Sequence, residues 1–434
     1  MVNKQEPLPI KSSSSQYAIL FPGSTMDPDL SKHFLLDKNH NEHHIFYTDF
    51  GLHNHFTHHY LAAYSLGASK ERLQFIYDLH ATTLNRPRPD SVGVLTLENY
   101  RNELGNRRAY TSFLEFFKQE IKKHGTTNAM CKWVFLDDNM MARFLGGALH
   151  PLIHLGYAVE FDLPNLAAEG LAMAACENDE VLPFLPVSQQ QNVADDEEPH
   201  SNGILSAEAI ISKVQNDPGL DNIVTFGGKN MNTGVFTDEN VRSIIREYAQ
   251  LKHFLYLFFK DPQASLRELF IQSMLLYSTT GIRGQQTKFD FFILHGLTSL
   301  HAAHTLMPYL TSAQAEKLLR SHLAVMLIWY MRCGRPRLQF ESLKNYKSLN
   351  NNHDGESNPW FDVINRAIRA QESHCIKVIR ALALGQVIYR DAFKEEDGDL
   401  WLKAAQATLN AAGISPEAQV CWNYAGVGFK ETWE

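Results

Sequence analysis

Apolar side chains recur at the spacing of an α-helix through most of this chain, and this pattern constrains the fold more than any other feature of the sequence. From Ser69 to Thr83, for example, Leu73, Ile76 and Tyr77 fall on one face of a helix. Helix-capping residues and terminal glycines bound several such segments. Helices are also predicted at Thr57–Leu66, Ala109–His124, Ala207–Val214, from Thr237 through about Leu251, at Ala313–Cys333 and Trp360–Ala383, and after the N-cap Ser415.

Strand signals are few and occur only at Tyr17–Phe21 and Val92–Leu97. Two polar stretches, residues 187–203 and 347–358, are rich in turn-forming residues and are predicted to be surface loops. Neither loop is long enough to separate independent domains, and the sequence has no repeat of fixed period. We therefore predict a mainly α protein that forms a single large helical domain over residues 1–434.

The charge balance excludes several classes of partner. The chain has 40 Lys and Arg residues against 48 Asp and Glu residues, so its formal net charge is −8, which argues against nucleic acid. No run of about 18 apolar residues occurs, so no membrane partner is predicted. The first residues lack the apolar core of a signal peptide, and the five cysteines lack paired spacing. These features predict a cytoplasmic, reducing location and leave the oligomeric state open.

The sequence also lacks the common cofactor motifs. No G-x-G-x-x-G follows a predicted strand, and there is no P-loop, no G-x-S-x-G nucleophile motif and no H-E-x-x-H zinc motif. No residues are therefore predicted to bind a nucleotide or flavin cofactor. If the chain catalyses a redox reaction, the sequence favours a metal ion as the group that handles electrons.

Histidines are the most unusual feature of the composition. The chain has 20 of them, and many lie in apolar helical segments. Histidines three or four residues apart share one face of a helix, and helical bundles build internal metal sites from such pairs. Neutral imidazole suits iron, zinc, copper and nickel. The candidate clusters are His53, His55, His58 and His59; His150 and His154; His295, His301 and His304; and His374 with Lys377.

A structural role competes with metal binding at each cluster, because a single buried histidine is more often a hydrogen-bonded core residue. The other histidines give no metal signal. Four have no partner at ligand spacing: His80, His124, His253 and His322. Six lie in polar stretches or loops and are predicted to be surface residues: His33, His40, His43, His44, His200 and His353.

A site made only of histidines has an electrostatic problem, because neutral ligands leave the charge of a metal ion uncompensated in a medium of low dielectric constant. A carboxylate from Glu160 or Asp162 could supply the negative charge. The alternative is Lys377. Burial lowers the pKa of a lysine, and a neutral amine can add carbon dioxide to become an anionic carbamate. The pattern alone favours a surface lysine that extends into solvent.

At these clusters the chain resembles the questin oxidase-like family of fungal polyketide pathways. The resemblance runs from about Phe50 to the C-terminus and is strongest to members that act as iron-dependent dioxygenases on anthraquinones. Other members are described as Baeyer–Villiger oxidases of questin. The matching segments are HNHFTHHYLAAYSLGAS (53–69), HPLIHLGYAVEF (150–161), FDFFILHGLTSLHA (289–302) and HCIKVIRAL (374–382).

The resemblance implies a mononuclear non-haem Fe(II) site inside the helical core, with one histidine from each cluster and a lysine carboxylated by carbon dioxide. The implied metal ligands are His58, His154, His295, His374 and Lys377. Within the first cluster, His55 and His59 remain open as alternatives to His58. His301 likewise remains open as an alternative to His295, because helical spacing does not separate them.

The implied reaction is the oxidative cleavage of a carbon–carbon bond in an anthraquinone ring by dioxygen, which gives a benzophenone. An electron-rich phenol can supply electrons itself, in agreement with the missing nucleotide motif. Tyr157, Thr298 and Ser299 lie beside ligand candidates and could orient the substrate, although helix packing explains them equally well. Phenylalanines in residues 254–259 and 289–292 could line a flat aromatic pocket or simply fill the core.

Three other functions remain open. The first is a Baeyer–Villiger monooxygenase of the same substrates, which depends on NADPH or flavin or uses no cofactor; metal content and the need for a reductant would distinguish it. The second is a non-catalytic helical binding protein whose histidines are structural. The third is a zinc hydrolase, which would retain activity without oxygen.

Overall fold

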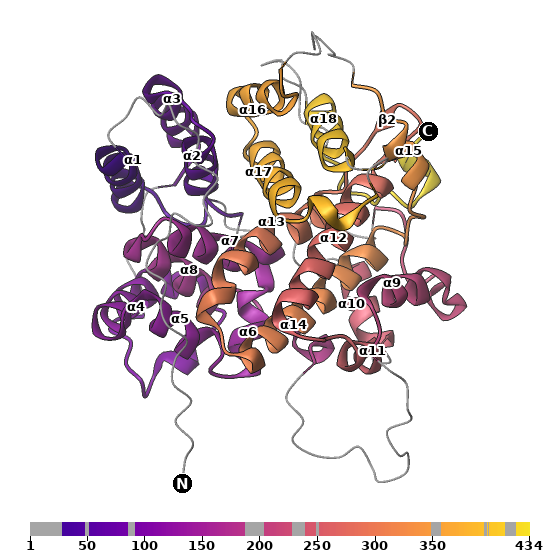
Figure 1. The fold of residues 1–434 in the computed structure, drawn as a ribbon. Coiled ribbons are helices and arrows are strands. Elements are labelled where there is room, and N and C mark those ends of the chain that lie inside the picture. The colour runs from indigo at the N-terminus through magenta and orange to yellow at the C-terminus, as the bar shows by residue number, and fades with distance from the viewer. Residues whose placement is uncertain are drawn as a thin grey trace, which may run out of the picture.

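The computed structural model describes residues 28–47, 52–85, 92–186, 204–227, 239–248, 251–348, 357–394, 397, 399–412 and 422–434. These residues form α-helices joined by turns, with one short hairpin (Figure 1). The mainly α fold class is therefore confirmed. The first eight helices are α1 Pro28–Glu42, α2 Phe56–Ser65, α3 Lys70–Ala81, α4 Tyr110–His124, α5 Thr126–Val134, α6 Asp138–Phe144, α7 Gly146–Glu160 and α8 Pro164–Cys176.

The second part of the chain contains the hairpin between two long helices. No helix among the described residues combines the length and the apolar character that crossing a membrane requires. The remaining elements are α9 Ala207–Asn216, α10 Glu239–Glu247, α11 Leu251–Leu257, α12 Pro262–Thr280, β1 Ile282–Arg283, β2 Gln286–Thr287, α13 Phe291–Leu306, α14 Ser312–Arg332, α15 Phe340–Lys344, α16 Trp360–Arg369, α17 Ser373–Ile388 and α18 Leu400–Ala412.

Most helix starts follow from capping residues that are visible in the sequence. Ser69 and Ser206 cap α3 and α9, because each hydroxyl accepts a hydrogen bond from one backbone N–H group of the first turn. Helix α14 is capped by Thr311 rather than by Ser312. Thr311 forms a capping box with Gln314, in which each side chain accepts a hydrogen bond from the backbone N–H of the other residue.

The single helix predicted at Trp360–Ala383 is wrong, because the segment contains two helices. Helix α16 ends at Arg369, and α17 begins at Ser373. Glu372 lies at the break and caps α17 with its carboxylate. The interruption therefore places a carboxylate directly beside His374, at the start of the new helix.

Two further predictions of local structure are corrected. The strand predicted at Val92–Leu97 is irregular chain that ends in a turn, whereas the hairpin β1–β2 was not predicted. The helix expected to run from Thr237 through about Leu251 ends at Glu247 as α10. Some predictions lie wholly or mostly outside the described residues: Tyr17–Phe21, the loops 187–203 and 347–358, and the N-cap Ser415.

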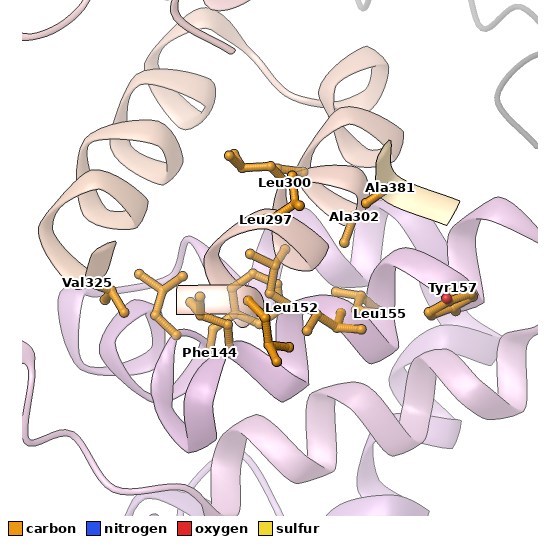
Figure 2. Close-up of a cluster of buried hydrophobic side chains, with 14 of the residues drawn as sticks. Phe144, Leu152, Leu155, Tyr157, Leu297, Leu300, Ala302, Val325 and Ala381 are labelled. Atoms are coloured by element: carbon orange, nitrogen blue, oxygen red, sulfur yellow. The ribbon is translucent and has the colours of Figure 1, made fainter. Parts of the chain in front are cut away.

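The interior is one continuous apolar cluster in which α7 contacts both α8 and α13. Figure 2 shows Leu152 and Leu155 of α7 facing Leu297 of α13 within this cluster. The two helices approach closely at Gly156, where a Cβ atom would lie only 2.7 Å from the Cα atom of Ala302. This close approach brings the histidines of α7 and α13 within reach of one another.

Helix α7 begins with a left-handed turn. Gly147, Ala148 and Leu149 have φ values of 54°, 52° and 65°, which are unfavourable for residues that carry a Cβ atom. Regular helix starts only after this turn, so Pro151 occupies a first turn where its missing N–H is not needed. The turn sets the direction in which His150 enters the core.

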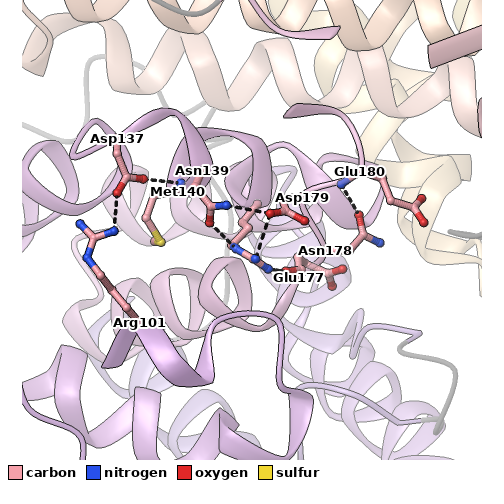
Figure 3. A network of polar contacts seen from close by, with 9 residues as sticks. Arg101, Asp137, Asn139, Met140, Glu177, Asn178, Asp179 and Glu180 are labelled. Carbon is pink, nitrogen blue, oxygen red and sulfur yellow. Dashed lines mark hydrogen bonds and ion pairs between the residues drawn. The ribbon is translucent and has the colours of Figure 1, made fainter. Parts of the chain in front are cut away.

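A polar network fixes the segment that follows α8 (Figure 3). Arg143 of α6 donates hydrogen bonds to the backbone carbonyl of Glu177 and, at 3.1 Å, to the carboxylate of Asp179. Asn139 donates to the same carboxylate of Asp179 at 2.7 Å. The side chain of Glu177 is thereby held in the core, where it has no exposed surface.

The contact at Gly156 predicts a difference between two glycines. Gly156→Ala pushes a methyl group against the backbone of Ala302, so we expect the variant to lose about 1–3 kcal/mol of unfolding free energy. Gly296→Ala is the matched control, because its methyl group meets only the flexible side chain of Met326, at 3.2 Å. Urea denaturation measures both variants. Equal stabilities of the two variants would contradict the close packing of α7 on α13.

Candidate metal centre

Histidines from four separate segments meet in the core. His55 directly precedes α2 and His150 follows the left-handed turn of α7, while His295 lies in α13 and His374 in the first turn of α17. Among the described residues, one nitrogen of each of His55, His150 and His374 lies within 4.8 Å of the others. The ring centre of His295 is 4.8 Å from that of His150 and 5.0 Å from that of His374.

Backbone carbonyls accept hydrogen bonds from the Nδ1 atoms of two of these rings, which leaves Nε2 for the cluster. Nδ1 of His295 donates to the carbonyl of Phe291, one turn earlier in α13, at 2.7 Å. Nδ1 of His150 donates to the carbonyl of Gly147 in the left-handed turn at 2.6 Å. In a neutral imidazole a proton on Nδ1 leaves the lone pair on Nε2. Nε2 of His150 lies 2.8 Å from Nε2 of His55, inside the cluster.

A carboxylate orients the ring of His374 through a hydrogen bond. Glu372 accepts a hydrogen bond from Nδ1 of His374 at 2.5 Å, and its other oxygen accepts from the backbone N–H groups of His374 and Cys375. Nε2 of His374 and Nε2 of His295 have no hydrogen-bond partner among the described residues, although both are buried. A buried acceptor without a partner costs about 1–3 kcal/mol. These nitrogens therefore fit a metal ion.

The electrostatics of the cluster keep the imidazoles neutral. Burial lowers the pKa of His55, His150 and His295 well below the ordinary value, and the neighbouring histidines and Lys377 lower it further. The pKa of His374 is also lowered, chiefly by burial and by Lys377, although Glu372 opposes the shift. Neutral imidazoles are the form that binds a metal ion, so no proton must leave before binding.

Lys377 lies one helical turn after His374 and is 2 % exposed, so its interpretation as a surface lysine is wrong. Burial lowers its pKa to about 7, and Glu372 acts in the opposite direction. Its Nζ atom has no hydrogen-bond partner among the described residues. Lys377 lines a small cavity that it shares with Tyr157, Glu160, Thr298, His301 and Arg380. A partly neutral amine thus faces a cavity beside the histidines.

The structure brings together three of the five ligands that the resemblance implies: His295, His374 and Lys377. The other two, His58 and His154, instead lie beside the cluster and contact each other, with Nε2 of His58 3.1 Å from Nδ1 of His154. The geometry favours His55 and His150 as the ligands from their segments. Residues three or four apart share one helix face, so the spacing could not distinguish these histidines.

Of the three residues expected to orient a substrate, two lie at the cavity. Tyr157 and Thr298 line it together with Lys377. Ser299 does not line it, because its hydroxyl group contacts Nε2 of His322 at 2.8 Å and donates to a backbone carbonyl of α13. Among the phenylalanines, Phe291 has its ring centre 5.0 Å from that of His374.

Of the two acidic residues considered as a source of negative charge, Glu160 is already paired and Asp162 lies at the surface. Glu160 is buried in a paired ionic contact with Arg380, at 2.9 Å for one of its two hydrogen bonds. Burial opposes the ionisation of Glu160, but Arg380 and His301 outweigh this effect and hold its pKa at about 2. Asp162 is exposed, at the end of α7.

Sequence reasoning missed the residues that orient the histidines. Besides Glu372, these are Glu169, which contacts His154, and Glu177, whose Oε1 lies 2.7 Å from Nε2 of His53. A signal was available for Glu169, because it is the only charged residue of the otherwise apolar helix α8. The surface prediction for three histidines is also corrected, since they are half-buried: His40, His43 and His44.

Comparison with known proteins gives one family. The model of the family described as questin oxidase-like matches residues 52–382. The chain is 28 % identical over 429 residues to the Baeyer-Villiger oxidase ptaJ of Pestalotiopsis fici, covering 92 % of this chain and 91 % of the relative. It is 28 % identical over 431 residues to the questin oxidase of Aspergillus fumigatus, covering 92 % of each. It is 28 % identical over 381 residues to the oxidoreductase AflY of Aspergillus parasiticus, covering 84 % of this chain and 74 % of the relative.

The four-histidine arrangement predicts which variants lose metal. We expect His55→Ala and His374→Ala to bind Fe(II) more than about 100-fold more weakly than the parent protein, because each removes a ligand rather than an outer contact. His322→Ala is the control, since His322 is equally buried but contacts Ser299 outside the cluster. Metal bound per chain, measured after gel filtration, gives the result. Full retention of metal by His374→Ala would contradict the site.

The buried amine of Lys377 predicts a dependence of stability on pH. Its pKa falls from 10.5 to about 7 on folding, so between these values the unfolded chain holds a proton that the folded chain lacks. The resulting loss of unfolding free energy in the metal-free protein is complete below about pH 7 and disappears as the pH rises through about 10. We therefore expect Lys377→Met to be more stable than the parent at neutral pH, by at least about 1 kcal/mol.

That advantage of Lys377→Met narrows as the pH rises from about 7 toward 10, because the penalty in the parent protein fades. Urea denaturation of both metal-free proteins at the two pH values measures the difference. Lys118→Met is the control, since this lysine lies at the surface beside Glu115 and its removal is expected to give no such trend. A constant difference between the parent and Lys377→Met would contradict a buried, partly neutral amine.

Proposed function

The chain belongs to the questin oxidase-like family, and we propose that it is a non-haem iron-dependent dioxygenase that opens an anthraquinone ring to a benzophenone in a fungal polyketide pathway. Its relatives are oxidases and oxidoreductases by name, which supports the general class of oxidoreductase. One observation carries the finer proposal. The lone pairs of His295 and His374 and the amine of Lys377 are buried without partners, in one cluster.

The donor set fits Fe(II). Four imidazoles from His55, His150, His295 and His374 would hold the ion, since imidazole is a ligand that iron accepts. Acceptors fix the second nitrogen of His150, His295 and His374, as the ligands of metal sites require. When bound, Fe(II) supplies the one-electron chemistry by which triplet dioxygen can react with a singlet aromatic molecule.

Lys377 would supply the negative charge that the histidines lack. The neutral amine attacks carbon dioxide, an N–C bond forms, and one amine proton leaves, which gives an anionic carbamate with oxygen atoms as donors. Tyr157 and Arg380 line the cavity that Lys377 faces, and both carry hydrogen-bond donors suited to a carbamate oxygen. A buried ammonium ion beside the site would repel the metal ion. Conversion of the amine to a carbamate would remove that repulsion.

Aromatic residues connect this site with the protein surface. Tyr424 is 41 % exposed, and its ring centre lies 4.5 Å from that of Phe291, which in turn lies 4.7 Å from that of His295. Trp422 contacts the ring of His374 from the same C-terminal segment. A flat aromatic substrate can stack on such a wall. Thr298, which lines the cavity beside Lys377, would then offer a hydroxyl group to the polar edge of the substrate.

The reaction balances without an external reductant when the substrate is the reduced, hydroquinone form. Both atoms of dioxygen enter the product, one ring carbon–carbon bond breaks, and the hydroquinone supplies the electrons. The resulting benzophenone carries a carboxyl group and a new hydroxyl group. The chain's part in this reaction is to bind the substrate, to hold the metal and to exclude water from the buried cluster.

A Baeyer–Villiger monooxygenase is the second candidate, because several relatives are named Baeyer-Villiger oxidase. Such an enzyme inserts one oxygen atom and reduces the other to water with two electrons from NADPH. The two candidates therefore differ in the number of oxygen atoms that the product gains from dioxygen. A binding protein would consume no oxygen, and a zinc hydrolase would turn over without it.

Isotope labelling tests the proposal directly. The Fe(II)-loaded protein is mixed anaerobically with a dihydroxyanthraquinone in its hydroquinone form, and ¹⁸O₂ is then admitted without NADPH. We expect a benzophenone that carries two labelled atoms, because a dioxygenase transfers both. His374→Ala and a mixture without protein control for spontaneous oxidation. A product with a single label, or turnover that requires NADPH, would reject the dioxygenase in favour of the monooxygenase.

A further inference from the structure

A second small cavity lies between α12, α13 and α14, apart from the cavity that Lys377 faces. Phe292 of α13 forms one of its walls, and no charged side chain of the described residues lines it. All of its wall residues are buried. The first cavity, by contrast, is lined by Glu160, Arg380 and Lys377. The other walls of the second cavity are Ser273, Leu276, Ile293, Gly296, Met326 and Trp329.

The second cavity offers few partners to water. Only two of its side chains carry a nitrogen or oxygen atom, Ser273 and Trp329. The hydroxyl group of Ser273 donates to the sulfur atom of Met326 at 3.0 Å, and the indole N–H of Trp329 has no partner among the described residues. Buried water molecules typically make about three hydrogen bonds, whereas cavities with apolar walls stay dry. The composition of these walls therefore favours a small apolar molecule over water.

The same cavity lies close to the metal cluster. Gly296, in its wall, directly follows His295 in α13. The ring of Phe292 has its centre 5.4 Å from that of Phe291. The ring centre of Phe291 in turn lies 4.7 Å from that of His295 and 5.0 Å from that of His374. One pair of adjacent phenylalanines thus connects the wall of the cavity with two of the four histidines.

Dioxygen is the small apolar molecule that this position favours. It has two atoms, no charge and no hydrogen-bond donor, so walls of hydrocarbon, sulfur and aromatic rings suit it. Dry apolar cavities of proteins take up xenon, which is similarly small and apolar. The choice of dioxygen rests on the proposed function, because both of its candidates, the dioxygenase and the monooxygenase, consume dioxygen at a buried site.

We propose that the cavity between α12, α13 and α14 binds dioxygen and supplies it to the metal cluster. A binding site at this position raises the concentration of dioxygen beside the histidines above that in solution. Filling the cavity should therefore raise the KM for dioxygen and leave kcat at saturating dioxygen nearly the same, because the walls of the cavity include neither a proposed metal ligand nor a residue proposed to bind the aromatic substrate.

Bound dioxygen can be located without turnover, because it is paramagnetic and speeds the relaxation of nearby protons. Protein with ¹³C-labelled methyl groups is loaded with zinc, which is diamagnetic and does not react with dioxygen, and its methyl relaxation is compared under dioxygen and under nitrogen. We expect the largest enhancement at Leu276, Ile293 and Met326, which line the cavity. Ile76 and Leu171 are the controls, since they are fully buried in other helices.

Two substitutions fill the cavity from different helices. Ser273→Val adds apolar volume from α12, and Gly296→Ala adds a methyl group from α13 that meets only the flexible side chain of Met326. Both should remove most of the relaxation enhancement. Ser278→Val is the matched control, because Ser278 lies in the same helix as Ser273 and is equally buried but does not line the cavity. Use of two variants protects the test against a folding defect in either one.

Kinetics of the Fe(II)-loaded protein test the supply of dioxygen. Initial rates are measured with a saturating dihydroxyanthraquinone in its hydroquinone form at several concentrations of dioxygen. We expect Ser273→Val and Gly296→Ala to raise the KM for dioxygen severalfold with little change in kcat or in bound metal. Ser278→Val should keep the KM of the parent protein.

Two outcomes overturn the proposal. Equal enhancement at cavity and control methyl groups means that dioxygen has no site there, and an unchanged KM in both filled variants means that the cavity does not supply the cluster. The proposed function fails separately, through the number of labelled oxygen atoms in the product. A monooxygenase that shows the predicted relaxation and KM values would therefore retain this inference.

Discussion

The structure depends on a single constraint, the need to keep several imidazole rings and an amine neutral and oriented in a dry core. Each ring has two nitrogens, and only one can face a metal ion. The other must find an acceptor that water would otherwise provide. Carbonyls of α7 and α13 and the carboxylate of Glu372 serve this purpose for His150, His295 and His374. The acceptors decide the tautomers, and the tautomers decide where the lone pairs lie.

Backbone features that look unfavourable in isolation serve the same constraint. The left-handed turn before His150 places non-glycine residues at positive φ, yet it supplies the carbonyl that holds the ring. Gly147 lies in this turn, and a Cβ atom there would be 2.8 Å from the carboxylate of Glu177 and from the ring of His53. Similarly, the break between α16 and α17 creates the N-terminus that Glu372 caps while it orients His374.

Much of the fold was predictable, because helical periodicity and capping residues are local. The ends of α3, α4 and α9 follow from the sequence to within two residues. At the site, His295, His374 and Lys377 stand out through their spacing in apolar segments. The preference for His55 over His58 was not predictable from the sequence, because it depends on the contacts that each ring makes with residues of α7 and α8. Periodicity likewise gives no sign of the break at Glu372, since apolar residues continue on both sides of it.

The distribution of charge is the physical reason for proposing a lysine, and not a nearby carboxylate, as the source of an anion. Each buried acidic side chain around the cluster already has a cation or a donor: Glu160 is paired with Arg380, Glu169 holds two histidines, and Glu372 caps a helix. Removing any of them from its partner would leave that partner unpaired in the core. Only the amine of Lys377 is uncommitted among the charged groups of the described site. The proposed carbamate would add a negative charge without breaking any contact that the Lys377 amine makes in the described structure.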